Sequence, residues 1–199
     1  MVASDGPAAG LPDLTRDRNA LRTAMRRHRR TLAAAQPDAG ERLPTHLEDL
    51  PPAASVAIYR AIGSEIDPLP LAMTLAARGR GLCLPVVVAR DAPLLFRRWS
   101  PGDALEPDAA GCPAPLPVAG VVRPDLILAP LLAFDAKGGR LGQGGGFYDR
   151  TLAELRRRPS PPGFVGVAFA GQEVAALPMA SHDQRLDGVL TESGYRAFP

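Results

Sequence analysis

The stretch Phe134–Arg150 reads FDAKGGRLGQGGGFYDR, and the rest of the chain is best interpreted from it. Of the nine residues from 138 to 146, six are glycine. An apolar run, 126–130, precedes the stretch, and an amphipathic segment, 147–158, follows its glycines. This order predicts a strand, a glycine loop and a helix. Backbone N–H groups in such a loop can approach a ligand closely, and the N-terminus of the following helix attracts anions, most often phosphate.

The charged residues beside these glycines indicate the kind of ligand. Lys137 and Arg140 come before the densest glycines, and Asp149 and Arg150 come after them. Cations and a carboxylate together suit a phosphate chain that carries a divalent metal. A flexible hairpin or linker is the alternative, but it does not need the side chains that interrupt the glycines or the aromatic pair that follows. The stretch matches neither the P-loop nor the dinucleotide pattern, so the residues alone predict a site for a phosphate-type anion with a metal.

Composition limits the class of protein. The chain has 199 residues, 46% of them apolar, which is enough for a packed core in one domain or two small ones. A net charge of +2 is too small to indicate a nucleic-acid partner by itself. Cys83 and Cys112 lack the spacing of a metal or redox motif, and no signal peptide or membrane-length apolar run is present. We therefore expect a cytoplasmic, monomeric protein with no membrane and no nucleic-acid partner.

Strand-like and helix-like segments alternate along the chain. Residues 1–14 are predicted to be a disordered tail, and 15–199 a single domain. The predicted helices are 15–35, 41–50, 69–78 and 147–158, and the predicted strands are 55–59, 81–88, 94–99, 126–130 and 164–169. Such alternation is typical of a three-layer α/β fold with a mostly parallel sheet.

The first predicted helix carries a row of arginines. Arg18, Arg22, Arg26 and Arg29 follow at helical spacing and share one face. A solvated basic surface, a nucleic-acid contact and a phosphate clamp for the glycine loop are the three interpretations. The nucleic-acid interpretation lacks aromatic partners and a larger basic patch.

A family resemblance extends the argument. The residues that carry it are Phe134-Asp135, Gly139-Arg140-Leu141-Gly142, Gly144, Gly146 and Tyr148-Asp149. They resemble the signature of the 5-formyltetrahydrofolate cyclo-ligase family. Further similarity runs through about residues 15–195. The resemblance implies a Rossmann-like fold related to ribose-phosphate isomerase and CoA-transferase domains.

The resemblance also implies an activity and a set of site residues. The activity is the ATP- and Mg²⁺-dependent conversion of 5-formyltetrahydrofolate to 5,10-methenyltetrahydrofolate, with ADP and phosphate as the other products. The expected ATP-binding residues are Arg18, Arg22, Arg140, Leu141, Gly142, Gln143, Gly144, Gly145, Gly146, Phe147 and Tyr148. The expected folate-binding residues are Glu65, Gln143 and Phe147, and the expected metal residues are Asp149 and Asp183.

Four positions depart from the family pattern. Arg18 stands where the family has lysine, and Pro68 stands where it has threonine. Ala114 replaces a glutamate, and Gln143 replaces an arginine or a tyrosine. These departures support an alternative, a non-catalytic member that binds folate or nucleotide. A second alternative is an RNA-binding protein that uses the basic helix.

Overall fold

The structure is a computed structural model that describes residues 14–199, with side chains described from Arg18 onward. Residues 1–13 of the predicted tail lie outside the described residues, and Leu14 is the first residue of helix α1. Across the described part of the chain, no helix is both long enough and apolar enough to cross a membrane.

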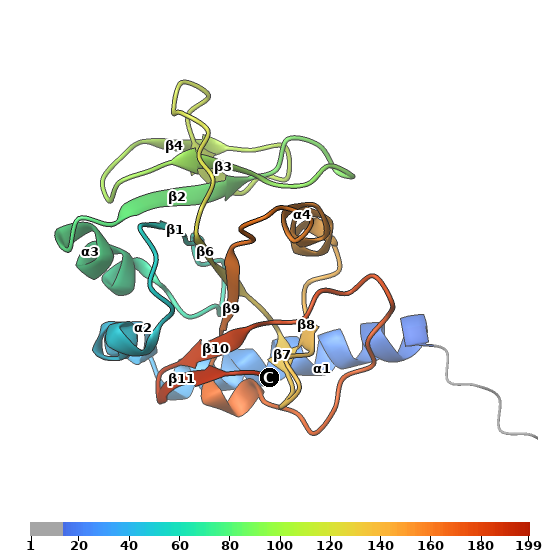
Figure 1. Ribbon diagram of the computed structural model, residues 1–199. Helices are drawn as coiled ribbons and strands as arrows, with labels where there is room; N and C mark the ends of the chain where they lie inside the picture. Colours follow the sequence, from blue (N-terminus) through green and yellow to red (C-terminus); the bar gives the residue numbers. More distant parts are fainter. Residues whose placement is uncertain (1–13) are drawn as a thin grey trace, which may run out of the picture.

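A seven-stranded sheet forms the centre of the molecule, in the order β11-β10-β9-β6-β1-β2-β3 (Figure 1). Its strands are β1 (Ser55–Ala57), β2 (Gly81–Val86), β3 (Leu95–Arg98), β6 (Leu126–Pro130), β9 (Gly163–Val167), β10 (Gly188–Thr191) and β11 (Gly194–Ala197). The strands from β10 to β2 are parallel, and only the edge strands β11 and β3 pair antiparallel with their neighbours. The predicted α/β fold with a mostly parallel sheet is confirmed.

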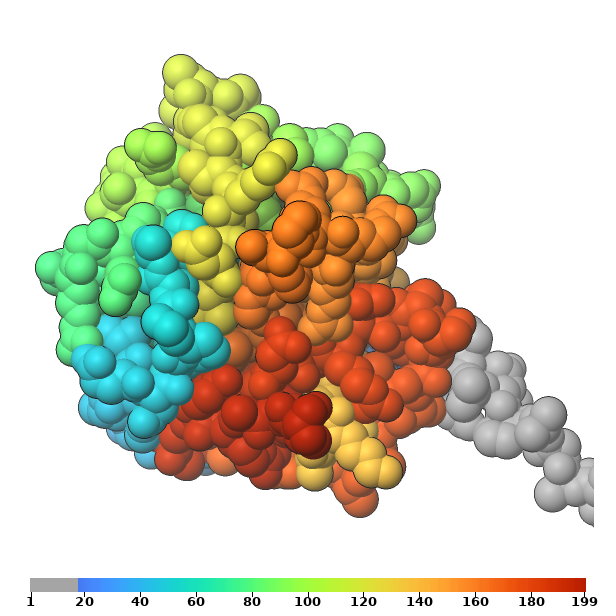
Figure 2. Space-filling view, viewed as in Figure 1, coloured from blue at the N-terminus to red at the C-terminus, as the bar shows by residue number. Residues whose placement is uncertain are grey.

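Helices cover both faces of this sheet because its central strands are apolar on both sides. Leu126 and Leu128 of β6 pack in the cluster that includes α3 (Leu69–Ala77), α2 (Ala39–Arg42) and the 3-10 helix η1 (Leu43–Asp49). Ile127 and Ala129, which point the opposite way, pack in the cluster that includes α4 (Phe147–Leu155). The α3 helix and α4 accordingly lie on opposite sides of the sheet (Figure 1). The same view in space-filling form shows α4 in orange beside the C-terminal strands in red (Figure 2).

Helix α1 (Leu14–Ala35) packs on segments outside the main sheet. Its Met25 lies in a small apolar cluster with Leu132, Ala133 and Leu141. Those residues belong to, or adjoin, a two-stranded hairpin of β7 (Ala133–Phe134) and β8 (Arg140–Leu141). The 3-10 helix η2 (Ala170–Gln172) also contacts α1.

Pro44 and a hairpin account for two differences from the predicted elements. The predicted helix 41–50 is divided into α2 and η1, because Pro44 lacks the N–H of an α-helix interior. Pro85 lies in β2, an internal strand, where proline is unusual because it lacks an N–H. It is tolerated because β1 pairs with β2 only up to Cys83, so Pro85 has a strand partner in β3 but none in β1. The predicted loop 100–120 contains a hairpin of β4 (Leu105–Pro107) and β5 (Pro113–Pro115).

Candidate functional site

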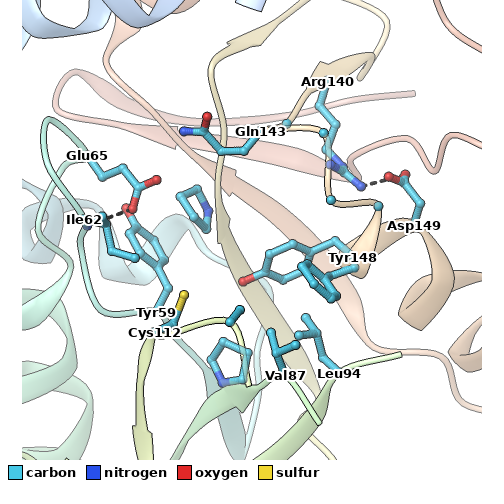
Figure 3. A pocket seen from close by; sticks show the side chains of 18 of the residues that line it. Tyr59, Ile62, Glu65, Val87, Leu94, Cys112, Arg140, Gln143, Tyr148 and Asp149 are labelled. Atoms are coloured by element: carbon cyan, nitrogen blue, oxygen red, sulfur yellow. Dashed lines mark hydrogen bonds and ion pairs between the residues drawn. The ribbon is translucent and has the colours of Figure 1, made fainter. Parts of the chain in front are cut away.

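A pocket of about 530 Å³ opens at the carboxyl ends of β1, β2 and β6. The chain runs from β1 to β2 on one side and returns to β6 on the other, so the strand order reverses at this point. A parallel α/β sheet leaves a crevice where its order reverses. The pocket is lined by the glycine loop, the start of α4, the arginines of α1, the segment after β1 and the β4–β5 hairpin (Figure 3).

Asp135 shapes the beginning of the glycine loop. Its Oδ1 accepts hydrogen bonds from the N–H groups of Lys137 and Gly139, each at 2.9 Å, and its Oδ2 accepts one from Leu177 at 3.0 Å. A side chain at position 139 would meet the Asp135 carboxylate at 2.6 Å. The aspartate and glycine of this motif are therefore structural residues, which form the turn between β7 and β8.

In the second half of the loop, residues 142–146, mainly backbone atoms line the pocket. Gly144 and Gly146 have φ values of 107° and 67°, in the left-handed region that favours glycine. Gly146 is the N-cap of α4, and no side chain caps the helix. The N–H groups of the first turn of α4 are thus available to an anion, as the sequence predicted.

The arginines of α1 hold the loop from the other side. Arg22 Nε donates to the carbonyl of Gly142 at 3.1 Å, and Arg26 Nε donates to Gln143 Oε1 at 2.9 Å. Burial, followed by the charges of Arg18 and Arg26, lowers the pKa of Arg22. Cations gathered in this way favour an anionic ligand. Of the predicted row, Arg18 and Arg22 line the pocket and Arg26 contacts the loop, whereas Arg29 does not line the pocket.

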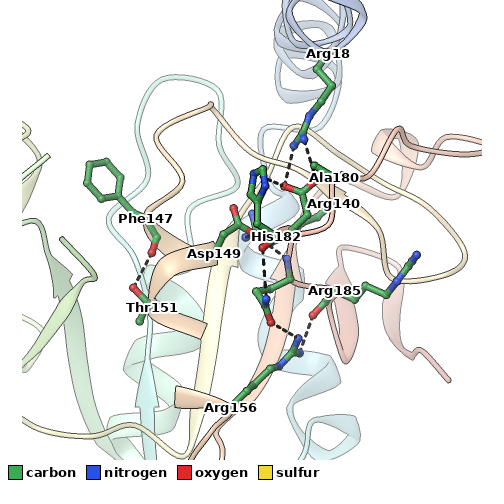
Figure 4. A network of polar contacts seen from close by, with 11 residues as sticks. Arg18, Arg140, Phe147, Asp149, Thr151, Arg156, Ala180, His182 and Arg185 are labelled. Carbon is green, nitrogen blue, oxygen red and sulfur yellow. Dashed lines mark hydrogen bonds and ion pairs between the residues drawn. The ribbon is translucent and has the colours of Figure 1, made fainter. Parts of the chain in front are cut away.

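Two carboxylates near the loop are both paired with arginine. Asp183 accepts both Nη groups of Arg18, at 2.9 and 3.1 Å, and the backbone N–H of Ala180 at 2.7 Å (Figure 4). Burial alone would raise the pKa of Asp183, but the Ala180 N–H and Arg18 lower it below its ordinary value. Asp149 Oδ1 accepts from Arg140 Nη2 at 2.7 Å and from the Gln184 N–H at 2.9 Å.

These carboxylates decide how well a metal fits. Within residues 14–199, no group of three or more His, Cys, Asp or Glu side chains is arranged to hold a metal ion. Asp149 still fits a magnesium that takes most of its ligands from phosphate and water, because both hydrogen bonds described for its carboxylate go to Oδ1. Asp183 can serve as a metal ligand only when its ion pair with Arg18 is broken.

Two nitrogen atoms on these arginines are buried and unpaired among the described residues. They are Nε of Arg18 and Nε of Arg140. Arg140 also lies over the ring of Phe164, 5.1 Å from its centroid, which fixes its guanidinium beside Asp149. Buried donors without acceptors are unfavourable, and both of these belong to side chains that line the pocket.

The opposite wall carries an acceptor, Glu65. Its Oε2 accepts the N–H of Ile62 at 3.0 Å, and its Oε1 accepts from Arg29 at 3.3 Å. Burial raises the pKa of Glu65, and the Ile62 N–H and Arg29 oppose that rise. Tyr59 supports the same segment by donating to the carbonyl of Ile66 at 2.7 Å. The carboxylate lies at the edge of the pocket (Figure 3).

Between Glu65 and the arginines the pocket is apolar. Val87, Leu94 and Tyr148 lie on its lower side in Figure 3. Tyr148 stacks on Phe164 with ring centroids 6.0 Å apart, and burial raises its pKa well above the ordinary value. Its hydroxyl is thus neutral near pH 7. A flat, partly apolar ring with polar edges suits this volume.

All the predicted site residues line this one pocket except Leu141. The Leu141 side chain is 1% exposed and packs against Met25 in the core, so only its backbone is near the loop. Of the four departures, Arg18 and Gln143 line the pocket. Pro68 is the N-cap of α3, and Ala114 is buried in β5.

Sequence reasoning missed the apolar residues and the segment after β1. Tyr59, Arg60 and Ile62 line the pocket because they follow directly on the carboxyl end of β1. Their position after a predicted central strand was a usable signal. Cys112 and Asp108 come from the β4–β5 hairpin, which the proline-rich composition of that region concealed.

The fold and the site together define a class: an α/β protein whose pocket joins a cation-lined glycine loop to an apolar slot with a carboxylate at its far side. The model of the 5-formyltetrahydrofolate cyclo-ligase family matches residues 14–192. The chain therefore belongs to the 5-formyltetrahydrofolate cyclo-ligase family, as its glycine motif predicted, and it is a ligase of that family.

Individual relatives agree over nearly the whole chain. A 5-formyltetrahydrofolate cyclo-ligase of Haemophilus influenzae is 34% identical over 185 residues, covering 88% of this chain and 98% of that protein. The Escherichia coli protein of the same name is 36% identical over 178 residues, covering 85% and 97%. The structure of the Aquifex aeolicus 5,10-methenyltetrahydrofolate synthetase superposes with a TM-score of 0.74 at 30% identity, covering 90% of this chain and 92% of that one.

Proposed function

We propose that this protein converts 5-formyltetrahydrofolate to 5,10-methenyltetrahydrofolate, with ATP as the second substrate and Mg²⁺ as the cofactor. The observation that carries the proposal is the composition of one pocket. Arginines and glycine backbone lie at one end, and Glu65 with an apolar slot lies at the other. A polyphosphate and a flat ring system need those two environments side by side.

ATP is assigned to the end formed by the glycine loop. Backbone N–H groups of residues 142–146 and the start of α4 would bind its phosphates, and Arg18, Arg22 and Arg140 would offset their charge. The unpaired Nε atoms of Arg18 and Arg140 support this assignment, because a phosphate oxygen would give them acceptors. Phe147, with Arg150 over its ring at 5.0 Å, would pack against a flat part of a ligand.

The folate is assigned to the end formed by Glu65 and the apolar slot. The Glu65 carboxylate would accept hydrogen bonds from N–H groups on the edge of the pterin ring. Gln143 and Phe147 line the same pocket, and we assign both of them to contacts with both substrates.

Magnesium is assigned to Asp149, with Asp183 as the second carboxylate. When bound, Mg²⁺ neutralises charge on the phosphate chain. Asp183 is held by Arg18 in this structure, so its part in the metal site requires that pair to separate.

The reaction needs positioning more than acid–base chemistry. The γ-phosphoryl group of ATP passes to the formyl oxygen of the folate, which releases ADP and turns that oxygen into part of a good leaving group. N10 of the folate then attacks the activated carbon to form a C–N bond and gives up its proton to the departing phosphate or to solvent, and the C–O bond breaks as phosphate leaves. Phosphoryl transfer of this kind depends mainly on orientation and charge neutralisation, which the arginines and glycine loop would supply.

We also propose that the protein acts as a cytoplasmic monomer on these small molecules, without a nucleic-acid or membrane partner. The contacts of Arg22 and Arg26 with the glycine loop support this, because they direct the basic face of α1 inward to the site.

The decisive experiment is an absorbance assay for the methenyl product with 5-formyltetrahydrofolate, ATP and Mg²⁺. Product formation that requires all three supports the proposal. Binding of ATP or folate without turnover would instead establish the alternative, a non-catalytic binding member. Retention of RNA at moderate salt would favour the RNA-binding alternative.

A further inference from the structure

Arg29 is a charged side chain that enters the protein interior without reaching the pocket. It lies on α1, and its side chain is 6% exposed. Because burying an ionised group is unfavourable unless it is paired and hydrogen-bonded, its contacts indicate its role.

Those contacts converge behind Glu65. Arg29 Nε donates to Ser64 Oγ at 3.2 Å, and Nη1 donates to Glu65 Oε1 at 3.3 Å. The same Nη1 donates to the carbonyl of Leu131 at 3.2 Å, and Gln172 Nε2 donates to that carbonyl at 2.9 Å. The guanidinium is therefore held by two segments, residues 64–65 and Leu131, and Gln172 holds the Leu131 carbonyl in turn.

Glu65 is held on its other side as well. Its second oxygen accepts the Ile62 N–H, so the carboxylate is fixed between a backbone donor and a cation. Each carboxylate oxygen has two acceptor positions, and these two contacts use one on each. The remaining acceptor capacity is left for a ligand in the pocket that Glu65 lines.

We propose that Arg29 is a positioning residue, which keeps the Glu65 carboxylate ionised and directed into the pocket so that it accepts N–H groups of the bound ring. The inference rests on the proposed function for its choice of ligand. Arg29 itself touches neither substrate nor the reacting atoms.

The titratable groups around Glu65 do not change charge near pH 7, so a change in the charge of Glu65 can be measured there. Tyr59 and Tyr148 both have raised pKa values, and the pKa of Cys112 is raised by burial and by Asp108 and Glu65. These three groups therefore stay neutral between about pH 6 and 8. Among these groups Glu65 is therefore the one whose protonation can change over that range once its cation is removed.

The test compares Arg29→Met, Glu65→Gln and the double variant, with Arg30→Met as the control. Arg30 lies on the exposed side of the same helix. At pH 7 we expect Arg29→Met to raise KM for 5-formyltetrahydrofolate about tenfold or more, with a much smaller change in KM for ATP. This KM should fall again as the pH rises, because loss of the cation raises the pKa of Glu65 and the carboxylate reforms only at higher pH. Arg30→Met should keep the pH profile of the wild type, in which this fall is absent.

The double variant separates positioning from simple structural support. If Arg29 acts through Glu65, adding Arg29→Met to Glu65→Gln should change the folate KM less than twofold, and the pH dependence should disappear. Effects that multiply, or a flat profile in Arg29→Met, would overturn the proposal. If Arg29→Met does not fold, Arg29→Gln, which also removes the cation but keeps a hydrogen-bond donor, replaces it in the same cycle, and a shift of the profile in the same direction is expected.

A readout without turnover keeps this inference distinct from the proposed function. Glutamate carboxyl signals of the ligand-free protein, followed by ¹³C NMR, identify Glu65 by their loss in Glu65→Gln. A higher titration midpoint for Glu65 in Arg29→Met or Arg29→Gln supports the pairing even if the wild type forms no methenyl product. An unchanged midpoint refutes it whatever the enzyme does.

Discussion

Replacing Arg18 changes two charges at the phosphate end of the pocket at once. In Arg18→Ala the cation is lost, and the Asp183 carboxylate, whose two oxygens it holds, is released. The pair is largely buried, with side-chain exposures of 15% and 5%, so solvent screens it weakly. A charge-assisted contact of this kind with a phosphate contributes roughly 1.5–3 kcal/mol. We therefore expect ATP affinity to fall about ten- to a hundredfold.

The released carboxylate should add to this loss, because it repels a polyphosphate. Arg18→Ala/Asp183→Asn removes that repulsion, so it should bind ATP more tightly than Arg18→Ala alone. Arg18→Lys should keep most of the affinity, since a cation remains, although an ammonium cannot hold both oxygens as the planar guanidinium does.

Calorimetric titration of ATP into the four folded proteins tests this reasoning, with folate affinity measured in parallel. Folate binding should change much less, because Glu65 and the apolar slot lie at the other end. Equal ATP affinities in the wild type, Arg18→Lys and Arg18→Ala would remove α1 from the nucleotide site and refute the assignment. Arg27→Ala, an exposed change on the same helix, is the matched control.

Three further outcomes are expected. Gly142→Val should weaken ATP binding at little cost to folding, because its φ is not in the left-handed region and a new Cβ would meet Nη1 of Arg140 at 3.3 Å, a contact that a shift of a few tenths of an ångström relieves; unchanged affinity by titration would contradict a backbone cradle. Asp149→Asn should raise the Mg²⁺ concentration for half-maximal turnover in the absorbance assay, and an unaltered Mg²⁺ dependence would make Asp149 purely structural. The pKa of Asp183 is lower in the folded state, so its stabilisation is present above the ordinary aspartate pKa of about 3.9 and is lost as the pH falls through the folded value. In urea unfolding, the stability difference between wild type and Asp183→Asn should hence shrink below about pH 4, and a constant difference would argue against the shift.

The fold and the phosphate end of the site were accessible from the sequence because both leave local signals. Apolar runs such as 126–130 alternate with helical periodicity, which is enough to predict a parallel sheet with helices on both faces. The glycines at 144 and 146 were predicted as ligand-binding backbone, and their left-handed φ values give the physical reason for glycine there.

The end of the pocket at Glu65 depends on contacts between segments that are distant in the sequence, and no local pattern indicates that these segments meet. Nothing near Arg29 indicates that it pairs with a carboxylate 36 positions later, and its spacing with Arg26 suggested only a shared face. The β4–β5 hairpin was missed because Pro107, Pro113 and Pro115 lower strand propensity, although the hairpin is an isolated two-stranded pair where missing donors matter little.

The long-range contacts of α1 have a consequence for how the protein is made. Arg18 pairs with a residue 165 positions away, and His28 bonds the carbonyl of Gly171 across 143 positions. The helix leaves the ribosome before Gly171 and Asp183, which it contacts in the folded protein. Closing such long loops is slow, so we expect α1 to dock late, after the sheet has formed. Until then the part of its apolar stripe at Leu32, which lies against Gly171, is open to chaperones, and a nascent chain arrested before residue 171 should leave this helix sensitive to protease while α3 and the first strands are already protected.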